Sequence, residues 1–388
     1  GERANCYVAS VAGQEYSFDA TVAGNGVISQ ALAAAVGRYE GRTLSAALSG
    51  ASARLLWQSS PRLIDPASLR VEGGKIYFTL TSRPVLLGGN AVIGLYADAS
   101  SDEALWSWHI WITDADNAAL TALAETYILP SDYENEYGSG SVRMMDRNLG
   151  AVYKEDGPYA RSFRAPLYQW GRKDPFVNAD GTESSVYVAK YDIDGNRVRE
   201  VSEERPTYPS SDYESTNLQL AIQNPTIFYT APSSSYPVQD WLTDDAQRQD
   251  HDLWGGVSGY KTKYDPCPEG WKVPVAGAPW GFRSEYRKTG GLQDDGAYDA
   301  TAPWYCDYVN DNGFRYKQAD SGKEYWFPFT GKKDVVTGVL NGVGSGANYH
   351  TATRQNTLAI MELFAWGNPA SETGLNRPYG SSVRCIKE

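Results

Sequence analysis

Glycine and proline are so frequent in this sequence that long helices are disfavoured. The 388 residues include 38 Gly and 20 Pro, which weaken helix interiors but are well tolerated in turns between short strands. Aromatic residues, which favour strands, make up 13% of the chain, whereas Met occurs only 3 times. We therefore expect a mainly β protein with some α-helix and long loops.

Length and charge limit the classes of protein that this chain can represent. One domain usually spans about 100–200 residues, so a chain of 388 residues is expected to form two. No run of about 20 apolar residues is present, so the sequence holds no candidate membrane-spanning helix. The formal net charge of −12 argues against a nucleic-acid partner, which needs a basic surface, and against binding to an anionic membrane surface.

The cysteines allow at most two disulfides. They are Cys6, Cys267, Cys306 and Cys385, without a C-x-x-C pair or zinc spacing, so we expect no metal site and no cofactor. Exported proteins often tie a C-terminal strand to a rigid loop such as that around Cys267, although four buried thiols are the alternative. Because the sequence begins at Gly1 without Met, we expect a processed chain whose export signal has been removed.

The first 116 residues are rich in short strand candidates. Their expected pairs are residues 6–9 with 16–18 across Ala12-Gly13, 69–72 with 75–79 across Gly73-Gly74, and 90–97 with 104–112. Seven short strands in this length are typical of an immunoglobulin-like β-sandwich, so we place a first domain at residues 1–116. One helical candidate interrupts it, from Ile28 to Val36.

Residues 117–388 form the second predicted domain. Residues 117–125 are expected to make a short helical connector, and closing strands are expected at residues 325–329 and 382–386. Between about residues 180 and 250 the chain is polar and rich in Ser, Tyr, Asp and Pro. A segment of this length and composition predicts a long inserted loop, which is usually functional or partly disordered.

Several phrases of the sequence resemble one family of exported proteins. They are NCYV at 5–8, LWSWHIW at 105–111, MDRNLGA at 145–151, YQWGRKDPF at 168–176, YDPCPEGWKVP at 264–274 and SVRCI at 382–386. In this order they are similar to the Fibrobacter succinogenes major paralogous domain, which resembles the C-type lectin-like fold. Residues 338–367 and the insertion before Tyr264 share no phrase with it.

The resemblance implies a fold and a location but no ligand. It implies an α+β C-type lectin-like domain with long loops at residues 117–388, behind a fimbrillin-like N-terminal β-sandwich. It also favours a Cys267–Cys385 disulfide, since that fold brings its chain ends together. Cys6 and Cys306 lie in different predicted domains, so we expect them to stay unpaired. Such proteins are surface lipoproteins or fimbrial proteins, which implies an exported chain at the outer membrane surface or in a fimbrium.

Two motifs imitate ligand-binding sequences without the required context. The segment from Gly342 to Ala347 fits G-x-G-x-x-G/A, but a dinucleotide site needs a preceding strand and a following helix, so we expect a flexible loop. The segment from Asp192 to Gly195 resembles the start of a calcium loop but lacks its later ligands, so we expect a hairpin turn. The histidines are too scattered for a metal motif: His109, His251 and His350.

Aromatic residues in apparent loops are the best remaining signal for a binding site. Trp280 stands between proline and glycine, and Trp304-Tyr305 precede Asp307. A flat ring beside a carboxylate is suited to stacking on a sugar while polar groups bind its hydroxyls, and aromatic anchors also dominate protein interfaces. The alternative is that these rings pin long loops to the core. We predict a contact face formed by Trp280, Trp304, Tyr305 and Asp307.

These observations favour a non-enzymatic surface adhesin. Its expected partner is a glycan or a host or bacterial surface protein, and its sandwich is expected to pair an edge strand with other pilus subunits. Contact with a membrane is expected only through a lipid anchor outside this chain. Two alternatives stay open, an enzyme that acts on glycans or surface proteins and a purely structural envelope or pilus-assembly protein.

Overall fold

The chain folds into a mainly β structure built from several sheets. The computed structural model describes residues 3–25, 47–81, 88–128, 141–152, 165–177, 188–206, 213–232, 239–243, 245, 249, 252–256, 260–277, 279–280, 286–289, 304–309, 313–318, 321–365 and 368–388. Within these residues the helices are α2 (Asn117–Leu123), α4 (Tyr213–Gln223) and the 3-10 turn η1 (Pro66–Ser68). None of these described helices is long and apolar enough to cross a membrane.

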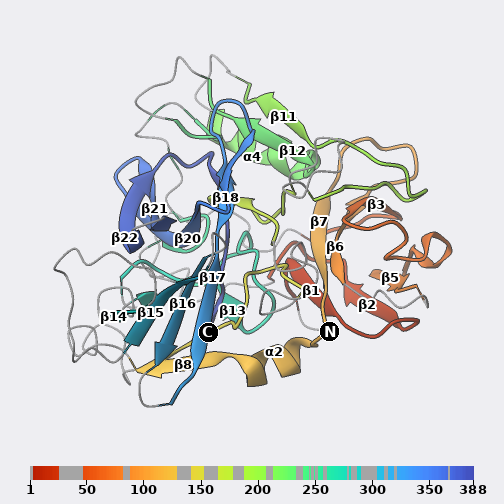
Figure 1. Cartoon of the computed structure of the whole chain (residues 1–388). Helices are drawn as coiled ribbons and strands as arrows, with labels where there is room; N and C mark the ends of the chain where they lie inside the picture. Colours follow the sequence, from red (N-terminus) through yellow and green to blue (C-terminus); the bar gives the residue numbers. More distant parts are fainter. Residues whose placement is uncertain are drawn as a thin grey trace.

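The N-terminal part is a sandwich of two sheets (Figure 1). Its strands are β1 (Cys6–Ala9), β2 (Glu15–Asp19), β3 (Ser52–Gln58), β4 (Arg70–Glu72), β5 (Lys75–Thr79), β6 (Gly89–Tyr96) and β7 (Trp106–Ile112). One sheet has the order β1-β7-β6-β3 and the other the order β2-β5-β4. The inner faces of the two sheets pack through aromatic rings. For example, the ring centroids of Phe18 of β2 and Trp108 of β7 lie 5.1 Å apart.

Local sequence signals located part of this sandwich and misplaced its first strands. Gly73 and Gly74 form the turn between β4 and β5, both with positive φ, and β6 pairs with β7, so both hairpins are confirmed. The expected hairpin across Ala12-Gly13 is wrong, because β1 runs parallel to β7 and β2 pairs with β5. Segment 28–36 lies outside the described residues.

The rest of the chain forms further small sheets. Their strands are β8 (Glu125–Ile128), β9 (Ser141–Met144), β10 (Tyr168–Gln169), β11 (Val201–Glu204), β12 (Ile227–Thr230), β13 (Trp271–Lys272), β14 (Tyr286–Thr289), β15 (Trp304–Val309), β16 (Gly313–Gln318), β17 (Glu324–Pro328), β18 (Thr330–Lys333), β19 (Leu340–Val343), β20 (Gly346–Gln355), β21 (Leu358–Ala365), β22 (Asn368–Leu375), β23 (Gly380–Ser381) and β24 (Ile386–Lys387). The sheets are β13-β24-β9-β8, β14-β15-β16-β17, the pair β11-β12, and β10-β23-β18-β20-β21-β22 with β19 beside β18.

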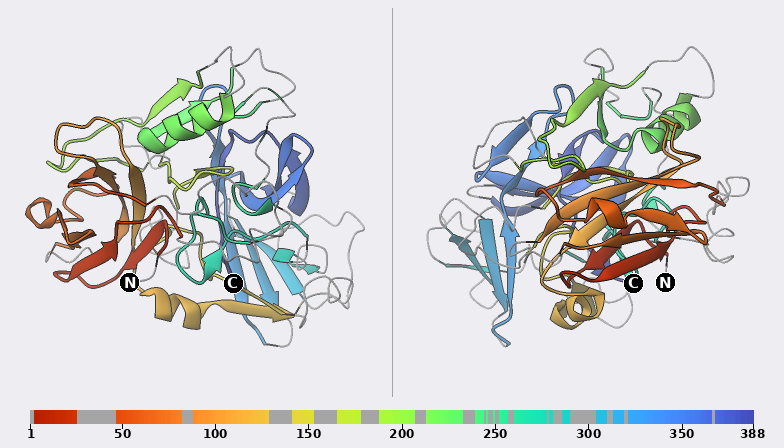
Figure 2. Two further views of the ribbon diagram at one scale, coloured as in Figure 1. Left: turned by 180° about the vertical axis from the view of Figure 1, so that it is seen from behind. Right: turned by 90° about the vertical axis from the view of Figure 1, so that its right-hand side faces the viewer.

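The closing strand expected at 325–329 is confirmed as β17, whereas the one expected at 382–386 is wrong, because only its last residue lies in a named C-terminal strand, β24. Two further expectations for this second part can be compared with these elements. The helical connector at 117–125 is confirmed as α2, whose N-cap Asp116 accepts a hydrogen bond from the Ala119 N–H at 2.7 Å. The expected insertion at 180–250 is more regular than its composition suggested, because its described residues include β11, α4 and β12. Figure 2 shows these elements stacked at one end of the molecule, opposite the two chain termini.

One hydrophobic cluster runs through both parts of the chain. It joins Phe18, Ile93 and Trp108 of the sandwich to Trp170 and Trp254 of the second part. A second cluster, around Trp280, Phe327 and Phe364, lies under the β14–β17 sheet. The two parts therefore bury apolar surface against each other, and their contact depends on close approach of the backbones.

Gly24 lies where the backbones of the two parts approach each other closely. Gly24 and Gly73 share nearly the same φ, +61° and +56°, so alanine is strained equally at both, by about 1 kcal/mol. A Cβ at Gly24 would lie 2.2 Å from the Lys263 carbonyl oxygen, whereas a Cβ at Gly73 would meet nothing within 4 Å. We expect Gly24→Ala to lower the free energy of unfolding by about 2–4 kcal/mol and Gly73→Ala by about 1 kcal/mol in urea titrations. Equal losses would contradict the close packing.

Candidate functional site

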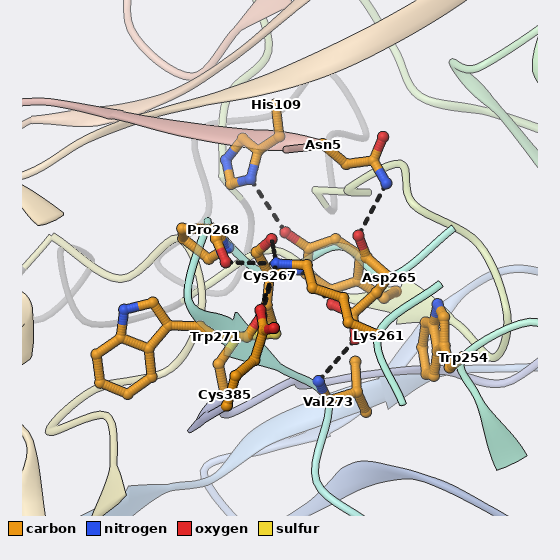
Figure 3. Close-up of a disulfide and its surroundings, with 12 residues drawn as sticks. Asn5, His109, Trp254, Lys261, Asp265, Cys267, Pro268, Trp271, Val273 and Cys385 are labelled. Atoms are coloured by element: carbon orange, nitrogen blue, oxygen red, sulfur yellow. Dashed lines mark hydrogen bonds and ion pairs between the residues drawn. A yellow bond between two sulfur atoms is a disulfide. The ribbon is translucent and has the colours of Figure 1, made fainter. Parts of the chain in front are cut away.

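The disulfide lies in a loop that is held by many hydrogen bonds. Cys267 and Cys385 are joined, with Cα atoms 6.1 Å apart, and both side chains are fully buried (Figure 3). The disulfide that the resemblance favoured is therefore present. Cys6 and Cys306 are buried thiols, as expected. Burial raises the pKa of the Cys6 thiol, which keeps it protonated and unreactive.

The Asp265 carboxylate fixes the shape of this loop. Its two oxygens accept hydrogen bonds from the backbone N–H groups of Cys267 at 2.8 Å and Val273 at 2.9 Å. One side chain thus holds both ends of the segment from Cys267 to Val273. Burial raises the pKa of Asp265 to about 6, while Lys261 and the two N–H donors act in the opposite direction.

Lys261 holds the inside of the same loop. Its Nζ donates to the carbonyl oxygens of Cys267 at 3.0 Å, Pro268 at 2.6 Å and Trp271 at 2.6 Å. Burial lowers the pKa of Lys261 below its usual value, although the Asp265 and Glu388 carboxylates act in the opposite direction. All three ammonium protons are used on backbone oxygens, so Lys261 is a structural cation and is not positioned as a base or nucleophile.

The N-terminal strand is attached to this loop by Asn5. The Asn5 Nδ2 donates to the carbonyl oxygens of Lys263 at 2.7 Å and Asp265 at 2.8 Å, and its Oδ1 accepts from Trp106 Nε1 at 3.0 Å. Next to it, Cys6 forms a parallel β-bridge with Pro268. Figure 3 shows Asn5 above Asp265, with the disulfide beneath.

Two buried histidines contact Tyr168 of the second part, and His109 does so from the sandwich. The His109 ring lies between Asn90 Oδ1 at 2.8 Å and the Tyr168 hydroxyl at 3.1 Å. The His350 Nε2 lies 2.7 Å from the Tyr168 carbonyl oxygen, and its ring meets Trp254 edge-on. Burial lowers the pKa of His109 to about 3 and of His350 to about 4, so both are neutral at pH 7.

Several other buried charges form ion pairs within the protein. Lys173 Nζ lies 2.6 Å from Asp174 Oδ1, which also accepts from the Ser107 hydroxyl. Further buried ion pairs join Arg377 to Asp240 at 3.3 Å and Lys333 to Glu200 at 2.5 Å. These contacts connect segments distant in sequence, which is a structural role for charged groups.

Two surface cavities lined by described residues are small. One of about 230 Å³ lies between β1 and the turn at Pro268 and Glu269, and one of about 100 Å³ lies beside Asp114. Small-molecule sites are usually about 300–1,000 Å³. The ion pairs of Lys173, Arg377 and Lys333 line neither cavity. Within the described residues, then, neither cavity is built for a small substrate.

The structure corrects the expectation for Trp280. Its ring is fully buried, and the ring centroid lies 6.1 Å from that of Phe327, 6.0 Å from that of Tyr349 and 6.4 Å from that of Phe364. A ring in this position cannot stack on an external sugar without the core opening. Trp280 is therefore a core residue below the β14–β17 sheet.

The other three predicted residues lie together in one strand. Trp304, Tyr305 and Asp307 belong to β15, so the expected loop is a strand, while their side chains lie outside the described part of the structure. In the antiparallel register Tyr305 stands opposite Lys317 and Asp307 stands opposite Arg315 of β16. These predicted positions thus lie beside a charged face of the sheet.

That face carries three charged side chains that the sequence prediction missed. Glu324 of β17 lies 3.6 Å from Arg315 and 3.7 Å from Lys317, and their side chains are 31%, 37% and 53% exposed. Arg315 also lies over the Trp326 ring, at 5.9 Å. The alternation of buried Phe314 and Tyr316 with these cations is a period-2 strand signal that was available in the sequence. A further missed residue is Tyr260, whose side chain is 49% exposed.

The two motifs that resemble ligand-binding sequences form turns in the structure. The segment from Gly342 to Ala347 spans the end of β19, a two-residue turn and the start of β20, so the flexible-loop expectation is wrong. A strand instead of a helix follows the turn. The turn at Asp192 is confirmed, with its Oδ1 accepting from the Asn196 N–H at 2.8 Å. Among the described residues, no group of three or more metal-binding side chains comes together.

Comparisons with protein-family models, curated proteins and solved structures gave no match to this chain. The resemblance to the Fibrobacter succinogenes major paralogous domain therefore stays a prediction from short sequence phrases. What the geometry defines by itself is a disulfide loop that joins the two parts of the chain, and a charged sheet face that is open to solvent.

The loop geometry predicts a large cost for removing Asp265. The Asp265→Ala change leaves two buried N–H groups and the Lys261 cation without their carboxylate, so we expect the free energy of unfolding to fall by about 3–5 kcal/mol. Asp98→Ala is the matched control, since Asp98 accepts N–H bonds from Ser100 and Ser101 but is exposed. Water replaces its bonds, so its loss should be much smaller in chemical denaturation. Similar losses would refute the role assigned to Asp265.

The buried histidines predict a loss of stability in mild acid. Their folded-state pKa values of about 3 and about 4 lie below the ordinary value of 6.5, so at intermediate pH the unfolded chain binds more protons. The contribution of the neutral histidines to the free energy of unfolding is complete above pH 6.5. It decreases as the pH drops toward 4, by about 1.4 kcal/mol per pH unit for each histidine. Urea titrations from pH 7.5 to 4 should show a shallower fall for His350→Gln than for wild type. The opposite contribution of Asp265 is common to both chains, and identical profiles would contradict the prediction.

Proposed function

We propose that this chain is an exported, non-catalytic surface protein of the adhesin type, which recognises a glycan or a surface protein through the outer face of the β15–β17 sheet. The observation that carries the proposal is the solvent-exposed group of Arg315, Lys317 and Glu324 on that face. In a chain of net charge −12, two adjacent exposed cations beside one carboxylate are a distinct recognition surface.

At the level of fold, the proposal combines an immunoglobulin-like N-terminal sandwich with a C-type lectin-like second domain. The two sheets of β1–β7 support the first, and the disulfide between the loop at Cys267 and the last strand supports the second. The boundary is proposed at residues 116–117, where α2 begins the crossing to the second part.

Export is supported by the disulfide. Disulfides persist in oxidising compartments and are rare in the cytosol, so Cys267–Cys385 favours the outer membrane surface or a fimbrium as the location. Attachment through a lipid anchor outside this chain, and pairing of a sandwich edge strand with pilus subunits, belong to the same proposal. A non-catalytic role is favoured because the buried charges described above are engaged with one another.

The charged face is suited to binding because it contributes little to folding. Exposed ion pairs are worth about 0–1 kcal/mol, so Arg315, Lys317 and Glu324 can exchange their mutual contacts for contacts with a partner. The Arg315 guanidinium offers planar, paired donors to hydroxyl, carboxylate or sulfate oxygens. Figure 1 shows the β14–β17 sheet on the side of the molecule away from the N-terminal sandwich, so a large partner can reach it.

A glycan array tests this proposal. We expect the wild type to bind a defined class of glycans and Arg315→Ala to weaken binding roughly tenfold, as for a central contact residue. The matched control is Arg70→Ala, because Arg70 also pairs with a glutamate and lies over a tyrosine ring, with a side chain 42% exposed, but belongs to the sandwich. Arg70→Ala should bind like the wild type.

Three outcomes would count against the proposal in different ways. An equal loss for Arg70→Ala would show that the β15–β17 face is not the contact surface. The absence of binding to glycans and to surface-protein extracts would favour the purely structural or pilus-assembly role. Release of product from a bound glycan would favour the enzyme alternative.

A further inference from the structure

Both ends of the chain are fastened to one loop. The segment from Lys261 to Val273, here called the clasp loop, contacts the N-terminal strand β1 on one side and the C-terminal strand β24 on the other. Figures 1 and 2 show the two termini at the same end of the molecule in every view. Tension between the ends therefore reaches this loop through short segments, residues 3–6 on one side and 385–388 on the other.

The N-terminal attachment is a group of hydrogen bonds buried at the loop. Asn5 donates to the carbonyl oxygens of Lys263 and Asp265, and Cys6 bridges to Pro268. Trp106 of β7 holds the Asn5 amide in place from the opposite side. A pull on residue 3 acts on these bonds together, because they fall on adjacent residues.

The C-terminal attachment is covalent. The disulfide joins Cys267 to Cys385, which lies three residues before the last residue, Glu388. Around it, Trp271 pairs with Lys387, the Glu388 N–H donates to the Gly270 carbonyl oxygen at 3.1 Å, and Lys261 lies 3.6 Å from Glu388. A pull on the C-terminus is thus transmitted to the clasp loop by a bond that does not yield.

The loop between the two attachments is itself held rigid. Asp265 bonds both of its ends, and Lys261 bonds three carbonyl oxygens on its inner side. The path from one end of the chain to the other therefore runs from Asn5 to Asp265, along two peptide bonds to Cys267, and across the disulfide. Strand β7 shares the load at Asn5, whose carbonyl oxygen accepts from the His109 N–H at 2.8 Å, and β9 shares it at Ile386 of β24. The other sheets between residues 6 and 265, and those between 268 and 384, lie beside this path.

We propose that the clasp loop is a force-bearing clasp, so that the protein holds tension between its two ends while its remaining sheets stay unloaded. This mechanical role goes beyond the proposed recognition function and does not depend on which ligand is bound. A surface protein that attaches to another body experiences tension, and that is the setting in which the clasp would act. The disulfide also closes a ring over a sequence separation of 118 residues, which cannot extend while the bond is intact.

Constant-force measurements on the full chain, with a handle at each end, test the proposal. We expect one long-lived folded state, whose lifetime is limited by opening of the Asn5 side of the clasp. Asn5→Ala removes two buried hydrogen bonds on the path, so its lifetime under the same force should be roughly tenfold shorter.

Asn217→Ala is the matched control. Asn217 is also a buried asparagine, and its Nδ2 donates to the carbonyl oxygens of Leu242 at 2.6 Å and Pro206 at 3.4 Å, but it lies off the path in α4. We expect it to lower the melting temperature without shortening the lifetime under force. A lifetime shortened as much as in Asn5→Ala would overturn the proposal.

The wild type with a thiol reductant gives a second test that needs no variant. Cys267 and Cys385 are fully buried, so the reductant should reach them only after the clasp has opened. Reduction then releases the ring as a separate extension of about 400 Å, after the first opening event. Release of the ring before that event would overturn the proposal. Neither result bears on glycan binding, and a failed glycan array leaves this test unaffected.

Discussion

The hydrogen bonds from the Cys267 and Val273 N–H groups to one buried carboxylate, Asp265, are the contacts on which the rest of the structure depends. They close the clasp loop, and this closure presents the Cys267 sulfur to Cys385 and two carbonyl oxygens to Asn5. The sandwich and the second part therefore meet on a surface that a single acidic side chain shapes. Proline on both sides of Cys267 reduces the conformations open to the unfolded loop, which lowers the entropy cost of forming it.

The same region shows how this protein uses buried charge. Lys173 and Asp174 lie where the two parts meet, and both contact Ser107 of the sandwich: Lys173 donates to its carbonyl oxygen, and Asp174 accepts from its hydroxyl. Such groups add little net stability when paired but cost several kcal/mol when a partner is lost. Another arrangement of the two parts would remove the Ser107 partners of Lys173 and Asp174, which favours the observed one. Burial of the shared hydrophobic cluster stabilises the contact between the two parts, and the charged groups fix their relative orientation.

Sequence reasoning succeeded where the cause of structure is local and failed where it is distant. The Gly73-Gly74 turn, the β6–β7 pair and α2 each depend on residues a few positions apart, and all are present. The β1–β7 pairing joins residues about 100 positions apart, and no local pattern encodes it, so Ala12-Gly13 gave a false hairpin. For the candidate site, the region of β15 was found, but Trp280 was misread because its proline and glycine neighbours suggested a loop. Only the fold shows that three aromatic rings enclose it.

The position of Cys385 has a consequence for the order of biosynthesis. The chain is made from its N-terminus at about 5–20 residues per second, so Cys385 follows Cys267 by roughly 6–24 s. During that interval Cys267 can meet Cys6, or Cys306 once it has been made, but not its native partner. Early folding of Cys6 into β1 and of Cys306 into β15 withdraws these thiols from oxidation. β-sheet formation thus buries the two unpaired cysteines before Cys385 becomes available to Cys267.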